Sequence, residues 1–309
     1  MGALTGFVTI GLVIGLGWLL AHLHVLGSDD RRLMSRIAFL VGCPALMGTM
    51  MAQADLERVF SLSVVASYGA IVLAALLGLL ASFTAFRSTQ RGRGRVITVL
   101  LACYSNAGNI GLPVAAYALG DVTWIAPILI IQMAFLQPAA LTILEASRGQ
   151  AAGQGLLRVL STPFRNPMTV GVLLGLAINL AGWTIPSILL EPLTLVGQTA
   201  VPLMLLAFGV SLRADPRPQP GPEQAESWFL ALTKVAIQPL FAFGLAHLLG
   251  LPAETIHAVT VVACLPPAQN IFMIASRYDV RLLFARDTIF RATGLAVVTI
   301  LAATALTHP

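Results

Sequence analysis

Polar residues interrupt the apolar sequence at two places, and their side chains are the ones best suited to binding a ligand. The first place is the stretch from Tyr104 to Pro113, YSNAGNIGLP, which lies inside an otherwise apolar run. The second is the stretch from Pro266 to Ile271, PPAQNI. Amide and hydroxyl groups donate hydrogen bonds and form no covalent intermediate in doing so. The chemistry predicted for both stretches is therefore noncovalent binding of a polar ligand.

The elements that carry these residues are expected to be broken helices. Pro113 lacks an amide hydrogen and clashes with the preceding turn, and Gly108 and Gly111 each cost a helix roughly 1 kcal/mol relative to Ala. Pro266 and Pro267 are expected to shape the second break in the same way. Unwound backbone within a membrane must be buried in protein or line a watery cavity. A helix N-terminus exposed there carries roughly +0.5 elementary charge, which favours an anion.

Composition places the chain in a membrane. Of its 309 residues, 57% are hydrophobic and 10% are charged, against roughly 25% charged in soluble domains. Cys43, Cys103 and Cys264 lie in apolar segments without metal-ligand spacing, so we expect buried apolar side chains and neither a metal nor a cofactor. The net charge of +5 comes from basic residues between apolar runs and predicts no nucleic-acid partner.

Ten apolar runs are each about long enough to cross the lipid bilayer, which predicts an all-α membrane protein with ten transmembrane helices. Sixteen of the 18 basic residues lie in the odd-numbered connections or the adjoining helix ends, which predicts that both termini face outside. Lys234 lies in the eighth run, near its cytoplasmic end, and we expect it to snorkel. The runs span residues 3–25, 33–52, 61–84, 96–120, 123–146, 167–184, 187–212, 228–250, 254–276 and 283–306.

Three collinear similarities indicate that the chain is an inverted repeat. Residues 11–20 resemble 171–180, Pro44 corresponds to Pro202, and residues 105–110 resemble 266–271. Five helices in each half reverse the orientation of the second half, an architecture common in secondary transporters. We therefore expect two inverted five-helix repeats, residues 1–149 and 167–309, joined by a cytoplasmic linker at 150–166. The broken fourth and ninth helices should cross near the membrane midplane.

The two motifs resemble those of the auxin efflux carrier family, which includes plant auxin exporters and bacterial malonate-type permeases. The motifs are NAGNIGLP at 106–113 and PPAQNIFMIASRY at 266–278. The resemblance implies a scaffold of helices 1, 2, 6 and 7 and a transport domain of helices 3 to 5 and 8 to 10. It also implies a small carboxylate as substrate. The short linker between helices 5 and 6 favours a bacterial-type permease of the cytoplasmic (inner) membrane.

Six residues are predicted to bind the substrate. Asn109 and Asn270 correspond in the repeat and can donate hydrogen bonds to a carboxylate, although the same amides could satisfy freed backbone groups. Asn106, Ser105 and Gln269 are their polar neighbours. The sixth is Arg291, about 12 Å into the tenth helix, which could neutralise the substrate; an ion pair with Asp287 or snorkelling is the alternative.

The breaks contain no Asp, Glu or His, so we expect uncoupled or electrogenic transport of a mono- or dicarboxylate by alternating access. A sodium- or proton-coupled carboxylate symporter with a fold like that of the bile-acid symporters is the alternative, and a Na⁺ site made of carbonyl and amide oxygens stays open. The sequence has no HExxH or GxSxG motif and no paired intramembrane Asp, so we do not expect an enzyme. A homodimer is a further open expectation.

Overall fold

The computed structural model describes residues 2–54, 56, 62–86, 92–147, 167–214, 221 and 223–307. The described residues form helices and turns, with one isolated bridge between Ser105 and Pro267 and no strand. The helical fold class is thus confirmed. The predicted linker at 150–166 lies outside the described residues.

The chain forms two compact units, and each unit combines segments from both halves of the sequence. The first consists of Met1–Val59, Ala107–Ile130 and Thr162–Pro216, and the second of Phe60–Asn106, Ile131–Ser161 and Arg217–Pro309. The first polar stretch is therefore divided between units, because Tyr104 to Asn106 belong to the second and Ala107 onward to the first.

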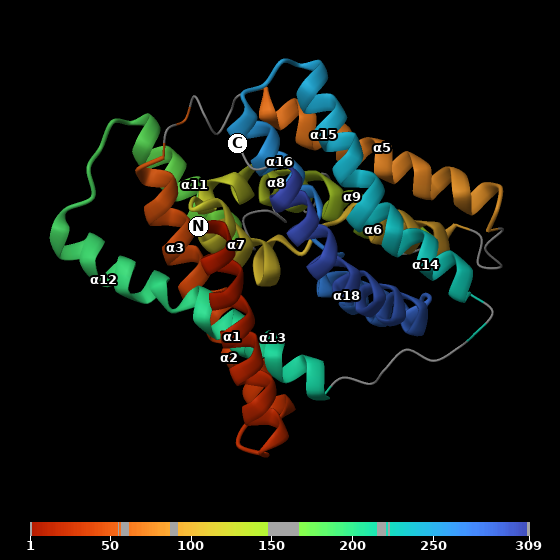
Figure 1. The fold of residues 1–309 in the computed structure, drawn as a ribbon, viewed down its shortest axis with the longest axis horizontal. Helices are drawn as coiled ribbons and strands as arrows, with labels where there is room; N and C mark the ends of the chain where they lie inside the picture. Colours follow the sequence, from red (N-terminus) through yellow and green to blue (C-terminus); the bar gives the residue numbers. More distant parts are fainter. Residues whose placement is uncertain are drawn as a thin grey trace. The chain divides into compact units, whose positions relative to one another are not determined.

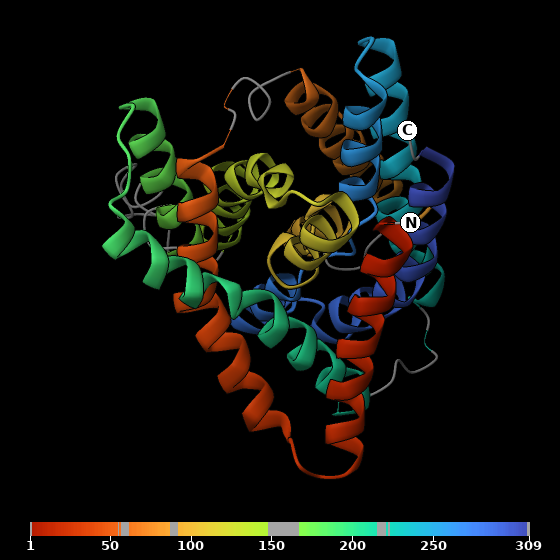
Figure 2. The same cartoon turned by 60° about the vertical axis from the view of Figure 1, so that its left-hand side comes forward.

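The first unit is built on two close pairs of helices, α1 with α13 and α3 with α11 (Figure 1). Each pair joins one helix from each half of the sequence. A short turn connects α1 to α2 (Figure 2). The elements are α1 (Gly2–His22), α2 (Ser28–Ile37), η1 (Ala38–Gly42), α3 (Cys43–Ala52), η2 (Ala107–Gly111), α7 (Leu112–Val114), η3 (Ala115–Leu119), η4 (Val122–Ile125), α11 (Pro167–Leu180), α12 (Ser187–Gln198) and α13 (Ala200–Ala214); α8 (Ala126–Ile131) ends at the boundary.

Glycines allow these helices to approach closely. A Cβ atom built on Gly171 would lie 2.4 Å from the Pro44 carbonyl oxygen, and one on Gly209 would lie 2.1 Å from that of Ile14. Asn179 of α11 adds two hydrogen bonds from its side-chain amide, to the carbonyl oxygens of Met51 (3.0 Å) and Ala54 (2.8 Å). Small residues at helix contacts are characteristic of packing in membranes, where lipid is as apolar as the protein core.

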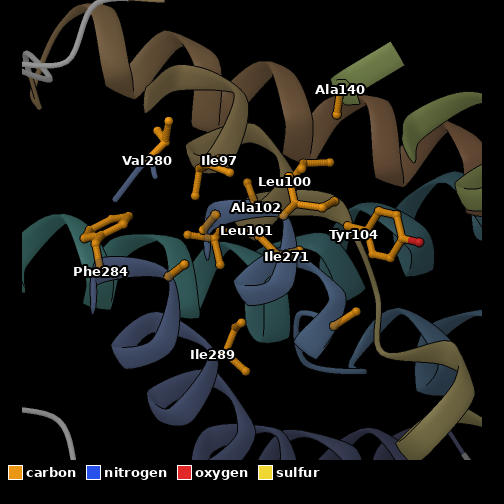
Figure 3. Packing of buried hydrophobic residues seen from close by; sticks show 14 of the residues in the cluster. Ile97, Leu100, Leu101, Ala102, Tyr104, Ala140, Ile271, Val280, Phe284 and Ile289 are labelled. Atoms are coloured by element: carbon orange, nitrogen blue, oxygen red, sulfur yellow. The ribbon is translucent and has the colours of Figure 1, made fainter. Parts of the chain in front are cut away.

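The second unit holds both helices that approach the isolated bridge. In it α15 packs against α5 and α16 (Figure 1), and α14 packs against α18. Its main buried cluster draws mostly on α6, α17 and α18, with further residues from α9 and α14, and includes Leu101, Ile271 and Phe284 (Figure 3). The elements are α5 (Ser63–Phe83), α6 (Arg93–Cys103), η5 (Gln132–Leu136), α9 (Gln137–Ala146), α14 (Gln224–Leu232), η7 (Thr233–Ile237), α15 (Gln238–Leu248), α16 (Ala253–Ala263), α17 (Gln269–Tyr278) and α18 (Leu282–Thr307).

Large apolar side chains point outward, as expected for helices in lipid. On α5 the buried residues include Ala66, Ala70 and Gly78, whereas Leu76 and Leu80 are exposed. A soluble helix buries its large apolar residues instead.

Helices occupy all ten of the predicted apolar stretches, and among the described residues five are long and apolar enough to cross a membrane by length and composition. Ten spans and an inverted repeat stay predictions. The five are Ser28–Ala52, Ser63–Phe83, Ser187–Val210, Gln224–Leu248 and Leu282–Thr307.

Candidate functional site

Two interrupted helices meet in the second unit, and their meeting point is the candidate site. The first, α6, ends at Cys103, and Tyr104 continues in an extended conformation. The second, α16, ends at Ala263, and α17 begins at Gln269. The bridge joins Ser105 to Pro267 in antiparallel fashion. We call the segments 104–106 and 266–268 the crossover.

Backbone hydrogen bonds hold the crossover together. The Asn106 amide donates to the Pro266 carbonyl oxygen over 2.7 Å, and the Ala268 amide donates to that of Tyr104 over 3.2 Å. Neither proline has an amide hydrogen to donate, and the pairing uses Pro266 only as an acceptor, through its carbonyl oxygen. Buried backbone groups freed by the two helix breaks therefore satisfy one another.

Amide side chains surround this pairing. The Ser105 amide donates to Oε1 of Gln132, and the Tyr104 hydroxyl donates to Oε1 of Gln137 over 3.0 Å. The Asn270 side chain also hydrogen-bonds the Tyr104 hydroxyl. Tyr104 and Gln132 are each 1% exposed. The crossover is thus a buried polar network inside an apolar protein.

One donor in this network has no partner. Nε2 of Gln132 is buried and makes no hydrogen bond in the structure. Its orientation is fixed, because Oε1 is needed to accept from the Ser105 amide. An orphaned buried donor costs about 1–3 kcal/mol, so such a group calls for an explanation. A hydrogen-bond acceptor on a ligand bound at the crossover would explain this donor, because it would be the missing partner of Nε2.

The N-terminus of α17 opens at the same place. Pro266 to Ala268 lead directly into α17, whose first residues are Gln269 and Asn270, both half-buried. The first turn of a helix has amide groups without intrahelical acceptors and a partial positive charge. Together with Gln132, this end of α17 presents donors suited to an anion.

The structure brings together four of the six residues predicted to bind substrate. Ser105, Asn106, Gln269 and Asn270 lie at the crossover or directly beside it. Asn109 lies in η2 of the first unit and is half-buried. A binding role for each of these residues stays a proposal.

Arg291 lies elsewhere, on α18 against α14. Its guanidinium donates to the Ser227 hydroxyl and lies 5.6 Å from the centroid of the Trp228 ring. Arg291 does not form the ion pair with Asp287 that was the alternative. Asp287 pairs instead with Arg286, whose Nη2 atom lies 2.6 Å from Oδ1 of Asp287. Arg291 thus makes these contacts within the helix packing, and its predicted role toward the substrate stays a prediction.

The first break does not lie at the Gly and Pro residues that were predicted to cause it. Gly108 and Gly111 lie in the π-helix η2, and Pro113 lies in the first turn of α7. The extended residues precede them, at Tyr104 to Asn106. Pro113 does not break the chain there, because a proline is tolerated in the first turn of a helix. Pro266 and Pro267, in contrast, lie in the second break as predicted.

Lys234 corrects a further prediction, since it does not snorkel. Its side chain is 0% exposed, and Nζ donates to the Ala263 carbonyl oxygen over 3.0 Å. Ala263 is the last residue of α16, which precedes the second break. A basic side chain therefore caps the C-terminal end of one of the interrupted helices, where the helix dipole is negative. Hydropathy gave no signal for this placement, because it does not tell which face of a helix is buried.

Interrupted helices paired by their backbones, in a chain whose outward faces are apolar, define a multi-pass membrane protein of the transporter class. Comparison with known proteins agrees with this class. The membrane transport protein model matches residues 3–152 and 155–304, and the chain belongs to this family, the auxin efflux carriers. The chain is a transporter and not an enzyme.

Two relatives are similar along nearly their whole length. An "uncharacterized transporter" of Methanothermobacter thermautotrophicus is 24% identical over 306 residues, covering 97% of each chain. A "putative malonate transporter" of Rhizobium meliloti is 27% identical over 319 aligned positions, covering 97% of this chain and 94% of the relative.

Proposed function

We propose that the protein carries a small organic carboxylate across the bacterial cytoplasmic membrane by alternating access at the crossover. The observation that carries this proposal is the orphaned Nε2 donor of Gln132, buried beside the Ser105 amide. The N-terminus of α17 adds a positive dipole at the same point. A carboxylate supplies both the acceptor oxygens and the negative charge that these groups lack. The similarity to a "putative malonate transporter" supports a small carboxylate as the substrate.

Transport is proposed to be electrogenic and to need no sodium. The segments 104–106 and 266–270 contain no Asp, Glu or His to carry a proton. A sodium-coupled symporter is the second candidate, favoured by the C-terminal ends of α6 and α16 beside the crossover, since carbonyl groups at such ends can coordinate Na⁺. The Lys234 amine already donates to one of these oxygens, that of Ala263, which weighs against this candidate.

Current measurements on reconstituted protein test the proposal. Purified protein in liposomes on a solid-supported membrane is exposed to malonate, malate, lactate and indole acetate, with and without Na⁺. We expect a saturable current with at least one carboxylate in the absence of Na⁺. A current that appears only with Na⁺ would favour the symporter, and the absence of any current, with saturable uptake of labelled malonate, would show electroneutral transport.

A further inference from the structure

A buried ionic cluster lies away from the crossover, at the connection between α17 and α18. The Arg281 guanidinium donates to Oε1 of Glu226 over 2.7 Å and also to Oε2, which makes the pair bidentate. A second carboxylate, that of Glu223, accepts over 2.9 Å. Thr98 accepts from Arg281 over 2.8 Å and donates to Glu226 over 3.2 Å. We call these four residues the Arg281 cluster.

The cluster is shielded from solvent. The side chains of Arg281 and Glu226 are 2% and 7% exposed, whereas that of Glu223 is 48% exposed. The guanidinium also lies 3.5 Å from the centroid of the Phe284 ring. A buried charge pair contributes little net stability, because desolvation offsets its attraction, but losing one partner leaves an uncompensated buried charge. Such a pair fixes geometry more than it adds free energy.

The backbone at this connection is held in an unusual conformation. Asp279 and Arg281 have φ angles of 52° and 49°, in the left-handed region that residues other than Gly rarely adopt. The Arg281 carbonyl oxygen accepts from the Ala285 amide over 2.9 Å and so begins α18. Strained backbone of this kind persists where surrounding contacts hold it in place. The Arg281 cluster provides those contacts.

Two of the elements that meet at the cluster, α6 and α17, also reach the crossover. Thr98 lies on α6, six residues before Tyr104. Arg281 follows the C-terminal end of α17, and the N-terminal end of this helix is Gln269. Glu226 lies on α14, which packs against both α6 and α18. α6 therefore reaches the cluster from its middle, at Thr98, and the crossover from its C-terminal end, whereas α17 has its N-terminal end at the crossover and its C-terminal end next to the cluster.

We infer that the Arg281 cluster is a positioning device: it ties α6 and α17 to α14 and thereby fixes the relative placement of the two segments of the crossover. Arg281 does not reach the crossover itself. It acts through the α17 helix, whose ten residues lie between the cluster and the amide groups at Gln269 and Asn270. The functional consequence rests on the proposed carboxylate transport, but the structural consequence can be measured without it.

Hydrogen exchange of the full-length protein in nanodiscs tests the structural consequence. In Arg281→Gln, peptides covering 100–106 and 266–278 should exchange faster than in the wild type. Arg286→Gln is the matched control, because Arg286 pairs with its neighbour Asp287 on α18 alone; it should leave these peptides unchanged. Unchanged exchange at the crossover in Arg281→Gln would overturn the inference whatever the protein transports.

Transport kinetics provide the functional test. Arg281→Gln should raise the half-saturation concentration for the transported carboxylate about tenfold, with a smaller effect on the maximal rate. Arg281→Lys keeps the charge but cannot bind bidentately, so its half-saturation concentration should lie between those of the wild type and Arg281→Gln. Arg281→Gln combined with Glu226→Gln should be milder than Arg281→Gln alone, because no unpaired buried carboxylate is left. A wild-type half-saturation concentration in Arg281→Gln would contradict the inference while leaving the proposed function intact. If Arg281→Gln does not fold, Arg281→Lys and the double variant carry the test.

Discussion

The Ser105 main-chain amide donates a hydrogen bond to the Gln132 side chain, whose own Nε2 group has no partner. This relationship makes Gln132 both a support for the crossover and a candidate ligand of the substrate. The two roles use different atoms of one amide group, so substitutions can separate them.

Gln132→Glu is expected to impair substrate binding while preserving the support. A carboxylate at this position still accepts from the Ser105 amide but replaces the free donor with a negatively charged acceptor. A hydrogen bond to a charged group contributes about 1.5–3 kcal/mol, so the half-saturation concentration should rise about 10- to 100-fold. Current titrations with the best substrate measure it.

Gln137→Glu is the matched control for Gln132→Glu. Gln137 lies five residues further along the same helical segment, and its Oε1 atom accepts from the Tyr104 hydroxyl, as a carboxylate also could. Its effect on the half-saturation concentration should be clearly smaller. Equal effects of the two substitutions would assign the loss to added negative charge and not to the Nε2 donor.

Asn270→Ala is expected to lower carboxylate affinity beyond what the loss of its contact with Tyr104 explains. Tyr104→Phe removes the hydroxyl that binds Asn270 and Gln137, and so isolates the structural part of the role. If Asn270 contacts substrate, Asn270→Ala should raise the half-saturation concentration at least tenfold more than Tyr104→Phe. Similar values for the two variants would show that Asn270 only supports the fold. Asn109→Ala tests the position that corresponds to Asn270 in the predicted repeat, in the same assay.

Sequence reasoning located the elements of the site well but not all of their contacts. Runs of apolar residues of bilayer length fix where helices form, and Pro266 and Pro267 fix a break because neither has an amide to donate. The first break was harder to place. Its Gly and Pro residues are accommodated in helical turns, and the extended segment lies at Tyr104, where no residue type forbids a helix.

Contacts between residues that are far apart in the chain could not be predicted from the sequence. Arg281 is one of the basic residues in the odd-numbered connections, and its position in the sequence does not reveal its partner, Glu226, which lies 55 residues earlier. Lys234 was expected at the membrane surface because of its distance from the helix end, a criterion that ignores which face of the helix packs inward. Both side chains are basic, and only the packing of neighbouring helices distinguishes them from exposed ones.

Lys234→Met is expected to keep the fold but weaken anion transport. Methionine is of similar length and removes both the donor to the Ala263 carbonyl oxygen and the basic group beside the crossover. The substitution also removes the cost of burying a basic group, which offsets the lost hydrogen bond, whereas a basic group beside the crossover no longer attracts the anion. The half-saturation concentration should therefore rise several-fold while the thermal unfolding midpoint stays nearly constant. An unchanged half-saturation concentration would restrict Lys234 to a structural role.

Two glycines that correspond in the predicted repeat should respond differently to the same substitution. A Cβ atom on Gly175 would lie 2.3 Å from the Gly48 carbonyl oxygen, whereas one on Gly15 has no neighbour within 4 Å. Gly175→Ala must separate α3 from α11 and should destabilise the protein by about 1–3 kcal/mol. Gly15→Ala should stabilise α1 by up to about 1 kcal/mol, because alanine is the better helix former. Thermal unfolding in detergent, followed by tryptophan fluorescence, compares them. Equal midpoints for the two variants would contradict the close packing of α3 and α11, on which the first unit is built.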